Sequence, residues 1–230
     1  MTQVSTHDHI VTSYGEELDD LADEIARMGG LVETQVIDAL TAVVRRDASI
    51  AKTVRKREIT VNAMQVDIEK KVIRLFALRQ PMATDLRVTI TALRLASDLE
   101  RIGDLAKTIA YRAADLNSYP PLEVTQRIER LGNIVTRQLR EVLDALSADN
   151  VEPAIRVWRN DDEVDEHYNS VIKEMLLLMS GDSSLVDPGA HILFVAKNLE
   201  RIGDHCTNIA EAVHYQVTGD TLESVEAAAP

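Results

Sequence analysis

The chain reads Leu99-Glu100-Arg101-Ile102-Gly103-Asp104 and repeats these six residues letter for letter as Leu199-Glu200-Arg201-Ile202-Gly203-Asp204. The match continues beyond the hexapeptide, where Ile109-Ala110 corresponds to Ile209-Ala210. The offset of 100 residues is close to half of the 230-residue chain, so two copies predict an internally duplicated fold. Each copy contains two carboxylates four residues apart, and the repeat therefore also marks a candidate site.

Helical periodicity covers most of the chain and predicts an all-α fold, without any hairpin signal or alternating run. Pro120-Pro121 interrupts this pattern near the midpoint and separates the two copies. The expected helices span residues 9–46, 49–78, 84–116, 122–146, 150–181 and 187–219. Three helices in each repeat, joined by short loops, predict two tandem antiparallel three-helix bundles related by internal duplication.

We expect the first bundle to occupy residues 1–118 and the second to occupy residues 119–219, followed by a flexible tail at 220–230. Gly29-Gly30 lies inside the first expected helix, where each glycine costs about 1 kcal/mol relative to alanine. A kink or a tight contact between helices explains this pair better than a role in binding a ligand.

The charge balance argues against several classes of function. The chain has 25 Lys and Arg against 38 Asp and Glu, a net charge of −13. This sign disfavours binding to nucleic acid and adhesion to anionic lipid. The single cysteine, Cys206, excludes an intrachain disulfide and fits a reducing cytoplasm. No apolar run is long enough to cross a bilayer and the N-terminus lacks a signal-peptide pattern, so we expect a cytoplasmic protein without direct membrane insertion.

The repeated acids lie opposite the apolar stripe of their helices. At 100° per residue, Glu100 and Asp104 fall about 140° and 180° from Leu95, which belongs to the core stripe. The second copy presents one polar strip, made of Glu200, Asp204, Asn208 and Glu211. Like charges four residues apart repel by a few tenths of a kcal/mol. A solvated face balanced by Lys107 and Lys197 is one explanation of this spacing, and a shared cation is the other.

A second polar pair on a neighbouring helix of each repeat favours the cation. Glu58 and Asn62 are four residues apart in the first repeat, and so are Asp161 and Asp165 in the second. The predicted metal ligands are Glu58, Asn62, Glu100 and Asp104 in repeat one, and Asp161, Asp165, Glu200 and Asp204 in repeat two, with Asn208 and Glu211 beside them. Oxygen ligands suit Mg²⁺, Mn²⁺, Ca²⁺ or iron, whereas a structural zinc site needs Cys or His.

An oxidase with a pair of metal ions bridged by carboxylates is an alternative hypothesis for the function. Ferritin-like oxidases use Glu-x-x-His on two helices. Here Gly103 and Gly203 stand three residues after Glu100 and Glu200, which weakens that alternative. No catalytic residue and no organic cofactor site is predicted, so we expect a protein that is not an enzyme.

Short motifs in a fixed order connect the chain to a known family. They are Met28-Gly29-Gly30-Leu31-Val32-Glu33, Arg79-Gln80-Pro81, Asp85-Leu86-Arg87, the two hexapeptides, and Asn208-Ile209-Ala210-Glu211. This ordered set resembles the PhoU family of bacterial phosphate-uptake regulators, and the similarity extends over nearly the whole chain to Gly219.

The resemblance implies two three-helix bundles, each with a surface metal site associated with Mg, Mn, Fe or Zn. It implies a negative regulator of the phosphate-starvation response and of high-affinity phosphate uptake. The implied partners are the ATPase subunit of the phosphate ABC transporter, a sensor histidine kinase and a second copy of the chain. Such partners would place the protein peripherally at the inner membrane. Asn62 departs from the family's carboxylate motif and lowers the charge of the first site. A purely structural helical adaptor that binds no metal is the remaining alternative.

Overall fold

A computed structural model of the chain describes residues 6–222, with side chains from residue 14 onward. Repeat one contains α1 (Thr6–Arg45), α2 (Ala48–Arg79) and α3 (Ala83–Leu116). Repeat two contains α4 (Thr125–Ser147), α5 (Val151–Arg159), α6 (Asp161–Gly181), the short 3-10 helix η1 (Ser183–Leu185) and α7 (Val186–Thr218). No strand occurs between residues 6 and 222. The predicted all-α class, with a pair of three-helix units, is confirmed.

The single helix predicted over residues 150–181 is wrong, because the chain breaks it at Asn160 into α5 and α6. The Asn160 amide donates to the carbonyl of Arg156 at 3.1 Å and closes α5, while its own carbonyl accepts from Glu163 at 3.2 Å. Three acids in the first turn of α6 suit the positive end of a new helix dipole. The break therefore places Asp161, a predicted ligand, in the first turn of α6.

Helix ends follow local polar chemistry at two of the short connections. Asp47 accepts from the Ser49 amide at 2.8 Å and starts α2. Asn150 accepts from the Glu152 amide at 3.1 Å and starts α5, as the sequence predicts. Each cap satisfies an amide that the first helical turn leaves free.

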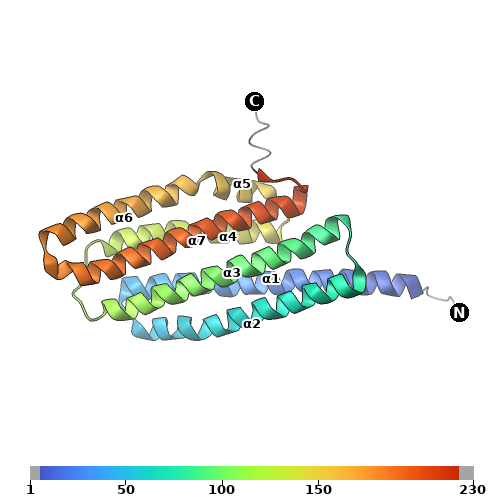
Figure 1. The fold of residues 1–230 in the computed structure, drawn as a ribbon, viewed down its shortest axis with the longest axis horizontal. Coiled ribbons are helices and arrows are strands. Elements are labelled where there is room, and N and C mark those ends of the chain that lie inside the picture. Colours follow the sequence, from blue (N-terminus) through green and yellow to red (C-terminus); the bar gives the residue numbers. More distant parts are fainter. Residues whose placement is uncertain (1–5, 223–230) are drawn as a thin grey trace, which may run out of the picture.

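The two repeats pack side by side over their length. Figure 1 shows α3 and α7 as neighbours in the middle of the molecule, running in opposite directions, with α1 and α2 on one side and α4 to α6 on the other. Contacts between α1 and α4 add a second junction. The buried apolar side chains form one continuous cluster that contains Met28 and Leu99 of repeat one together with Leu139 and Leu199 of repeat two. Burial of this shared cluster stabilises the repeats against each other.

Glycines make the junction between α1 and α4 close. A Cβ atom on Gly29 would lie 2.6 Å from Leu143 Cδ2, and one on Gly132 would lie 2.5 Å from Leu40 Cδ1. Gly132 follows Gly29 by 103 residues, and Leu143 follows Leu40 by the same interval, so the two contacts are copies of each other. The tight helix contact expected at Gly29 is confirmed, whereas a Cβ on Gly30 would meet open space.

The chain remains packed for a few residues after α7. Leu222 is buried, and His214 Nδ1 lies 3.0 Å from the carbonyl oxygen of Asp220. Of the tail predicted at 220–230, residues 223–230 lie outside the described part. None of the helices within residues 6–222 has the length and apolar character needed to cross a membrane.

Candidate functional site

The glycine of the first hexapeptide sets the approach of α3 to α2. A Cβ atom on Gly103 would lie 3.3 Å from Cγ1 of Val61. Val61 is buried and stands between Glu58 and Asn62 in sequence. The close crossing therefore brings this polar pair of α2 beside the acids of α3.

The second hexapeptide repeats this crossing between α7 and α6. A Cβ atom on Gly203 would lie 3.1 Å from Cγ1 of Val164, which stands between Asp161 and Asp165. Small residues allow the two helix backbones to approach, while the flanking side chains emerge at the edge of the core. Local sequence thus sets both crossings in the same way.

In repeat one, an ammonium group lies between carboxylates of the two helices. Lys107 Nζ donates to Glu58 Oε1 at 2.8 Å and to Asp104 Oδ1 at 2.7 Å. Asn62 Nδ2 donates to the same Glu58 oxygen at 2.7 Å. Glu58 is only 8% exposed, so these donors compensate a carboxylate that has lost most of its water. The amide oxygen of Asn62 is buried without a hydrogen-bond partner in the described part of the chain.

The electrostatics of repeat one follow from this ammonium. Burial raises the pKa of Asp104, but hydrogen bonds to Lys107 and Glu58 together with the charges of Lys107 and Arg101 outweigh it and hold that pKa below its ordinary value. Burial lowers the pKa of Lys107, but hydrogen bonds to Asp104 and Glu58 raise it overall. Glu100 has a raised pKa because of burial and of the nearby Asp104 charge, despite Arg101 at 3.7 Å.

In repeat two, a hydroxyl group occupies the equivalent position. Thr207 stands where Lys107 stands in repeat one, and its Oγ1 donates to Asp161 Oδ1 at 3.1 Å. Lys197 pairs with one of these acids: its Nζ lies 2.6 Å from Oε1 and 2.5 Å from Oε2 of Glu200. Lys197 comes from the same helix as Glu200, and its side chain is 48% exposed. Its ammonium also lies 5.4 Å from the ring centroid of Tyr168 on α6. Lys197 thus pairs with a carboxylate of α7 and an aromatic ring of α6, whereas Lys107 joins carboxylates of two helices.

The second site therefore holds excess negative charge. Burial raises the pKa of Asp204, and the charges of Glu200, Asp161 and Asp165 raise it further, against a smaller opposing effect of Lys197. The same position in the motif thus has a lowered carboxyl pKa in repeat one and a raised carboxyl pKa in repeat two. Carboxylates that repel one another in this way are suited to a hard cation.

The two sites contain side chains with oxygen atoms that can bind a metal, but these atoms do not form a coordination shell. Within residues 6–222, no three His, Cys, Asp or Glu side chains stand together in the arrangement of a metal site. The four carboxylates of repeat two are oxygen donors, the type of ligand that a hard cation prefers. Lys107 offers only hydrogen-bond donors, so repeat one as it stands does not fit one. The ligand assignment stays a prediction.

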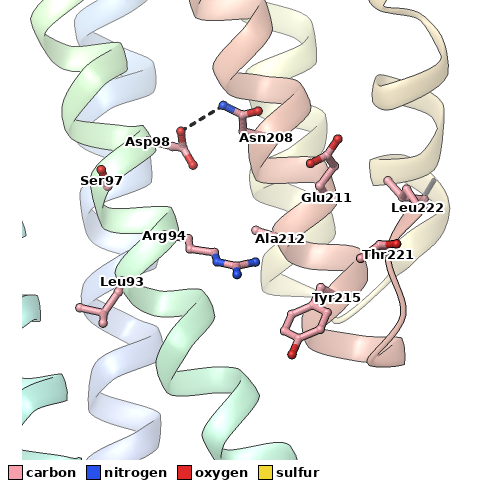
Figure 2. Close-up of a pocket in the computed structure, with 10 residues that line it drawn as sticks. All are labelled: Leu93, Arg94, Ser97, Asp98, Asn208, Glu211, Ala212, Tyr215, Thr221 and Leu222. Carbon is pink, nitrogen blue, oxygen red and sulfur yellow. Dashed lines mark hydrogen bonds between the residues drawn. The ribbon is translucent and has the colours of Figure 1, made fainter. Parts of the chain in front are cut away.

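Asn208 and Glu211 lie in a groove between the repeats. Asn208 Nδ2 donates to Asp98 Oδ1 on α3 at 3.4 Å, as Figure 2 shows. Glu211 Oε1 accepts from the indole of Trp158 on α5 at 3.1 Å. Both line a groove of about 670 Å³ between α3 and α7, where the Arg94 side chain also lies. The structure thus gives these two predicted ligands partners other than the four acids of repeat two.

Asp98 is a polar residue that sequence reasoning missed. His205 Nδ1 lies 2.8 Å from Asp98 Oδ1, in an ion pair or hydrogen bond that links α7 to α3. Asp98 comes just before the first hexapeptide and its repeat counterpart is Asn198, so no repeated pattern marked it. The link holds the two repeats together at the groove.

The PhoU domain, as a sequence family, matches the chain twice, over residues 25–113 and 128–213. The chain belongs to the PhoU family. The two matched segments contain one hexapeptide each, which agrees with the duplication seen in the helices.

Curated PhoU relatives cover almost the full chain. The phosphate-specific transport system accessory protein PhoU homolog of Caulobacter vibrioides is 49% identical over 218 residues, covering 94% of this chain and 95% of that protein. The crystal structure of PhoU from Pseudomonas aeruginosa superposes with a TM-score of 0.88 at 36% identity, covering 90% of this chain and all of that one. The phosphate transport system regulatory protein PhoU from Streptococcus pneumoniae gives a TM-score of 0.83 at 29% identity, covering 91% and 99%.

Proposed function

We propose that this chain is an accessory protein of a phosphate-specific transport system and works as a metal-binding regulatory adaptor. Its PhoU relatives are named for an accessory or regulatory role in phosphate transport and not for a reaction. In this role the chain represses the phosphate-starvation response and modulates phosphate uptake. It does so by contact with the transporter's ATPase subunit and a sensor histidine kinase, as a cytoplasmic homodimer that reaches the inner membrane through them.

The observation that carries the metal-binding part is the excess negative charge of repeat two. Glu200 and Asp204 on α7 flank a crossing with α6 that Gly203 tightens, and the charges of Glu200, Asp161 and Asp165 raise the pKa of Asp204. A hard cation such as Mg²⁺, Mn²⁺ or an iron ion would supply the missing positive charge. Zn²⁺ also accepts carboxylate ligands, although oxygen donors alone favour the harder ions.

Metal content of the purified protein tests the ligand assignment. We expect equilibrium dialysis against Mn²⁺ to load the wild-type chain, and a Glu200→Gln/Asp204→Asn variant to lose that metal. The matched control is Asp67→Asn/Glu69→Gln, which removes two acids from α2 outside both sites and keeps metal binding unchanged. Equal metal content in the Glu200/Asp204 variant and the wild type would refute the assignment.

Capture of the partner tests the adaptor role. We expect the immobilised chain to retain the transporter's ATPase subunit when Mn²⁺ is present, and to retain less after exhaustive chelation. The Glu200→Gln/Asp204→Asn variant should behave as the chelated wild type does in either buffer. Retention that chelation does not change would favour the alternative, a structural adaptor whose acidic faces bind a basic partner without metal.

A further inference from the structure

Positions 107 and 207 are equivalent in the repeat but differ in chemistry. We infer that Lys107 is the resident counter-ion of the repeat-one site and closes that site to a metal, so that the two halves of the chain have different tasks. This inference rests on the proposed function only for repeat two. For repeat one it rests on the contacts of Lys107 itself.

The Lys107 ammonium occupies the oxygens that a cation would need. It donates to one carboxylate from each helix, Glu58 on α2 at 2.8 Å and Asp104 on α3 at 2.7 Å. A cation shared between the two helices would have to displace this ammonium from a Glu58 side chain that is 10% exposed. The lysine is itself mostly shielded, with 26% of its side chain exposed, so water does not replace it readily as a partner.

Asn62 strengthens the same arrangement. Its amide nitrogen donates to Glu58 Oε1, the same carboxylate oxygen that accepts from Lys107, so this oxygen already has two donors. In repeat two the counterpart of Asn62 is Asp165, which carries a charge. Thr207 donates to Asp161, yet a hydroxyl also has lone pairs and can turn them toward a cation.

Counting formal charges gives the same contrast. Repeat one places Lys107 and Arg101 beside three carboxylates, Glu58, Glu100 and Asp104, which leaves a net charge of −1. Repeat two places Lys197 beside four carboxylates, which leaves a net charge of −3. The ion pair of Lys197 with Glu200 lies within α7 and is half-exposed, and its contact with α6 is to the Tyr168 ring at 5.4 Å. Lys197 therefore does not join a carboxylate of α6 to one of α7.

The two repeats therefore differ in what neutralises their acidic side chains. In repeat one α2 and α3 are joined permanently by the chain's own ammonium. In repeat two the chain's own polar link between α6 and α7 is the hydrogen bond from Thr207 to Asp161, and only an external cation would join their carboxylates. Metal availability thus changes only the second repeat, and with it the surface next to the groove that α7 shares with α3.

Gain of metal binding tests the inference. We measure Mn²⁺ stoichiometry by equilibrium dialysis for the full chain and for Lys107→Thr, which copies the residue of repeat two. We expect Lys107→Thr to bind additional Mn²⁺ and to lose that addition when Asp104→Asn is combined with it. Lys70→Thr, which removes an exposed lysine of α2 that pairs with Asp67, is the control and should gain nothing.

A second variant and a second measurement test the inference in case Lys107→Thr alone is too unstable for dialysis. Asn62→Asp/Lys107→Thr gives repeat one four carboxylates, and its melting temperature should rise on addition of Mn²⁺ by more than that of the wild type. Variants that stay folded by circular dichroism and bind no more Mn²⁺ than the wild type would overturn the inference. The inference would also be overturned if the Glu58→Gln/Asp104→Asn variant bound less Mn²⁺ than the wild type.

The outcomes also separate this inference from the proposed function. A wild-type chain that binds no Mn²⁺, together with a Lys107→Thr variant that does, would refute the proposed metal of repeat two and support the role of Lys107. A wild-type chain that loses all Mn²⁺ in Asp161→Asn/Asp204→Asn, with no gain in Lys107→Thr, would support the proposed function and refute the role of Lys107.

Discussion

Replacing the last acid of each hexapeptide by asparagine should change stability in opposite directions. The substitutions Asp104→Asn and Asp204→Asn are chemically identical and occupy equivalent positions in the repeat. Asp104 accepts from Lys107 at 2.7 Å, so its charge stabilises the fold. Asp204 lies among other carboxylates without a bridging cation, so its charge destabilises the fold when no metal is present.

The expected magnitudes follow from these surroundings. A hydrogen bond to a charged group contributes about 1.5–3 kcal/mol against about 1 kcal/mol for a neutral one. Solvent reduces this difference because 36% of the Asp104 side chain is exposed, and relief of repulsion with Glu100 offsets a few tenths more. Asp104→Asn should therefore cost about 0.5–1 kcal/mol. Asp204→Asn should gain about 0.5 kcal/mol, from repulsion with Glu200 and two further acids on α6.

Thermal unfolding of chelator-treated protein at neutral pH and low salt measures both effects. For a chain of this size about 1 kcal/mol corresponds to about 2–4 °C. Asp104→Asn should thus melt about 2 °C below the wild type and Asp204→Asn about 1–2 °C above it. Shifts of the same sign in the two variants would refute the electrostatic difference between the repeats. Added Mn²⁺ should reverse the order for Asp204→Asn, because the wild type then gains a ligand-dependent stabilisation.

The difference between these variants should also depend on pH. The pKa of Asp104 is lowered in the folded protein, so its charge stabilises the fold and this stability is lost as pH falls through the lowered pKa. The pKa of Asp204 is raised in the folded protein, so its charge destabilises the fold and this cost disappears as pH falls through the raised pKa. As pH falls, Asp204→Asn should come close to the wild type at about pH 4, the ordinary carboxyl pKa, and Asp104→Asn only below that pH; a pH-independent gap would contradict the assignment of charge. Gly30→Ala should raise the free energy of unfolding by up to about 1 kcal/mol through helix propensity, because a Cβ there meets open space. Gly203→Ala should lower it by about 1–3 kcal/mol, because the new Cβ would lie 3.1 Å from a valine whose rotamer is fixed in its helix, and an equal gain in both variants would show that the crossing is loose. Cys206 should resist thiol reagents in the native protein and react on unfolding, since complete burial raises the pKa of the thiol; fast labelling of the folded chain would contradict this.

The helices could be predicted from the sequence with few errors because their signals are local. Apolar periodicity, the double proline and the helix caps each act within a few residues, and the helix ends other than the break at Asn160 lie within about three residues of the expected positions. The missed break has a local signal too, since Asn160 is followed by three acids that suit a helix start. The apolar pattern continues through α5 and α6, and it led us to predict one helix there in spite of that signal.

The sequence by itself determined that the fold is duplicated and that the acids of each hexapeptide lie off the core stripe. These properties follow from spacing along one helix, which fixes the direction of each side chain to within part of a turn. Only the tertiary structure decided which polar side chains contact one another. Lys107 turns toward Glu58 on another helix, and Asn208 and Glu211 find partners on α3 and α5. Such choices depend on how two helices cross and on which partner a long side chain reaches, and neither is encoded in a single helix's pattern.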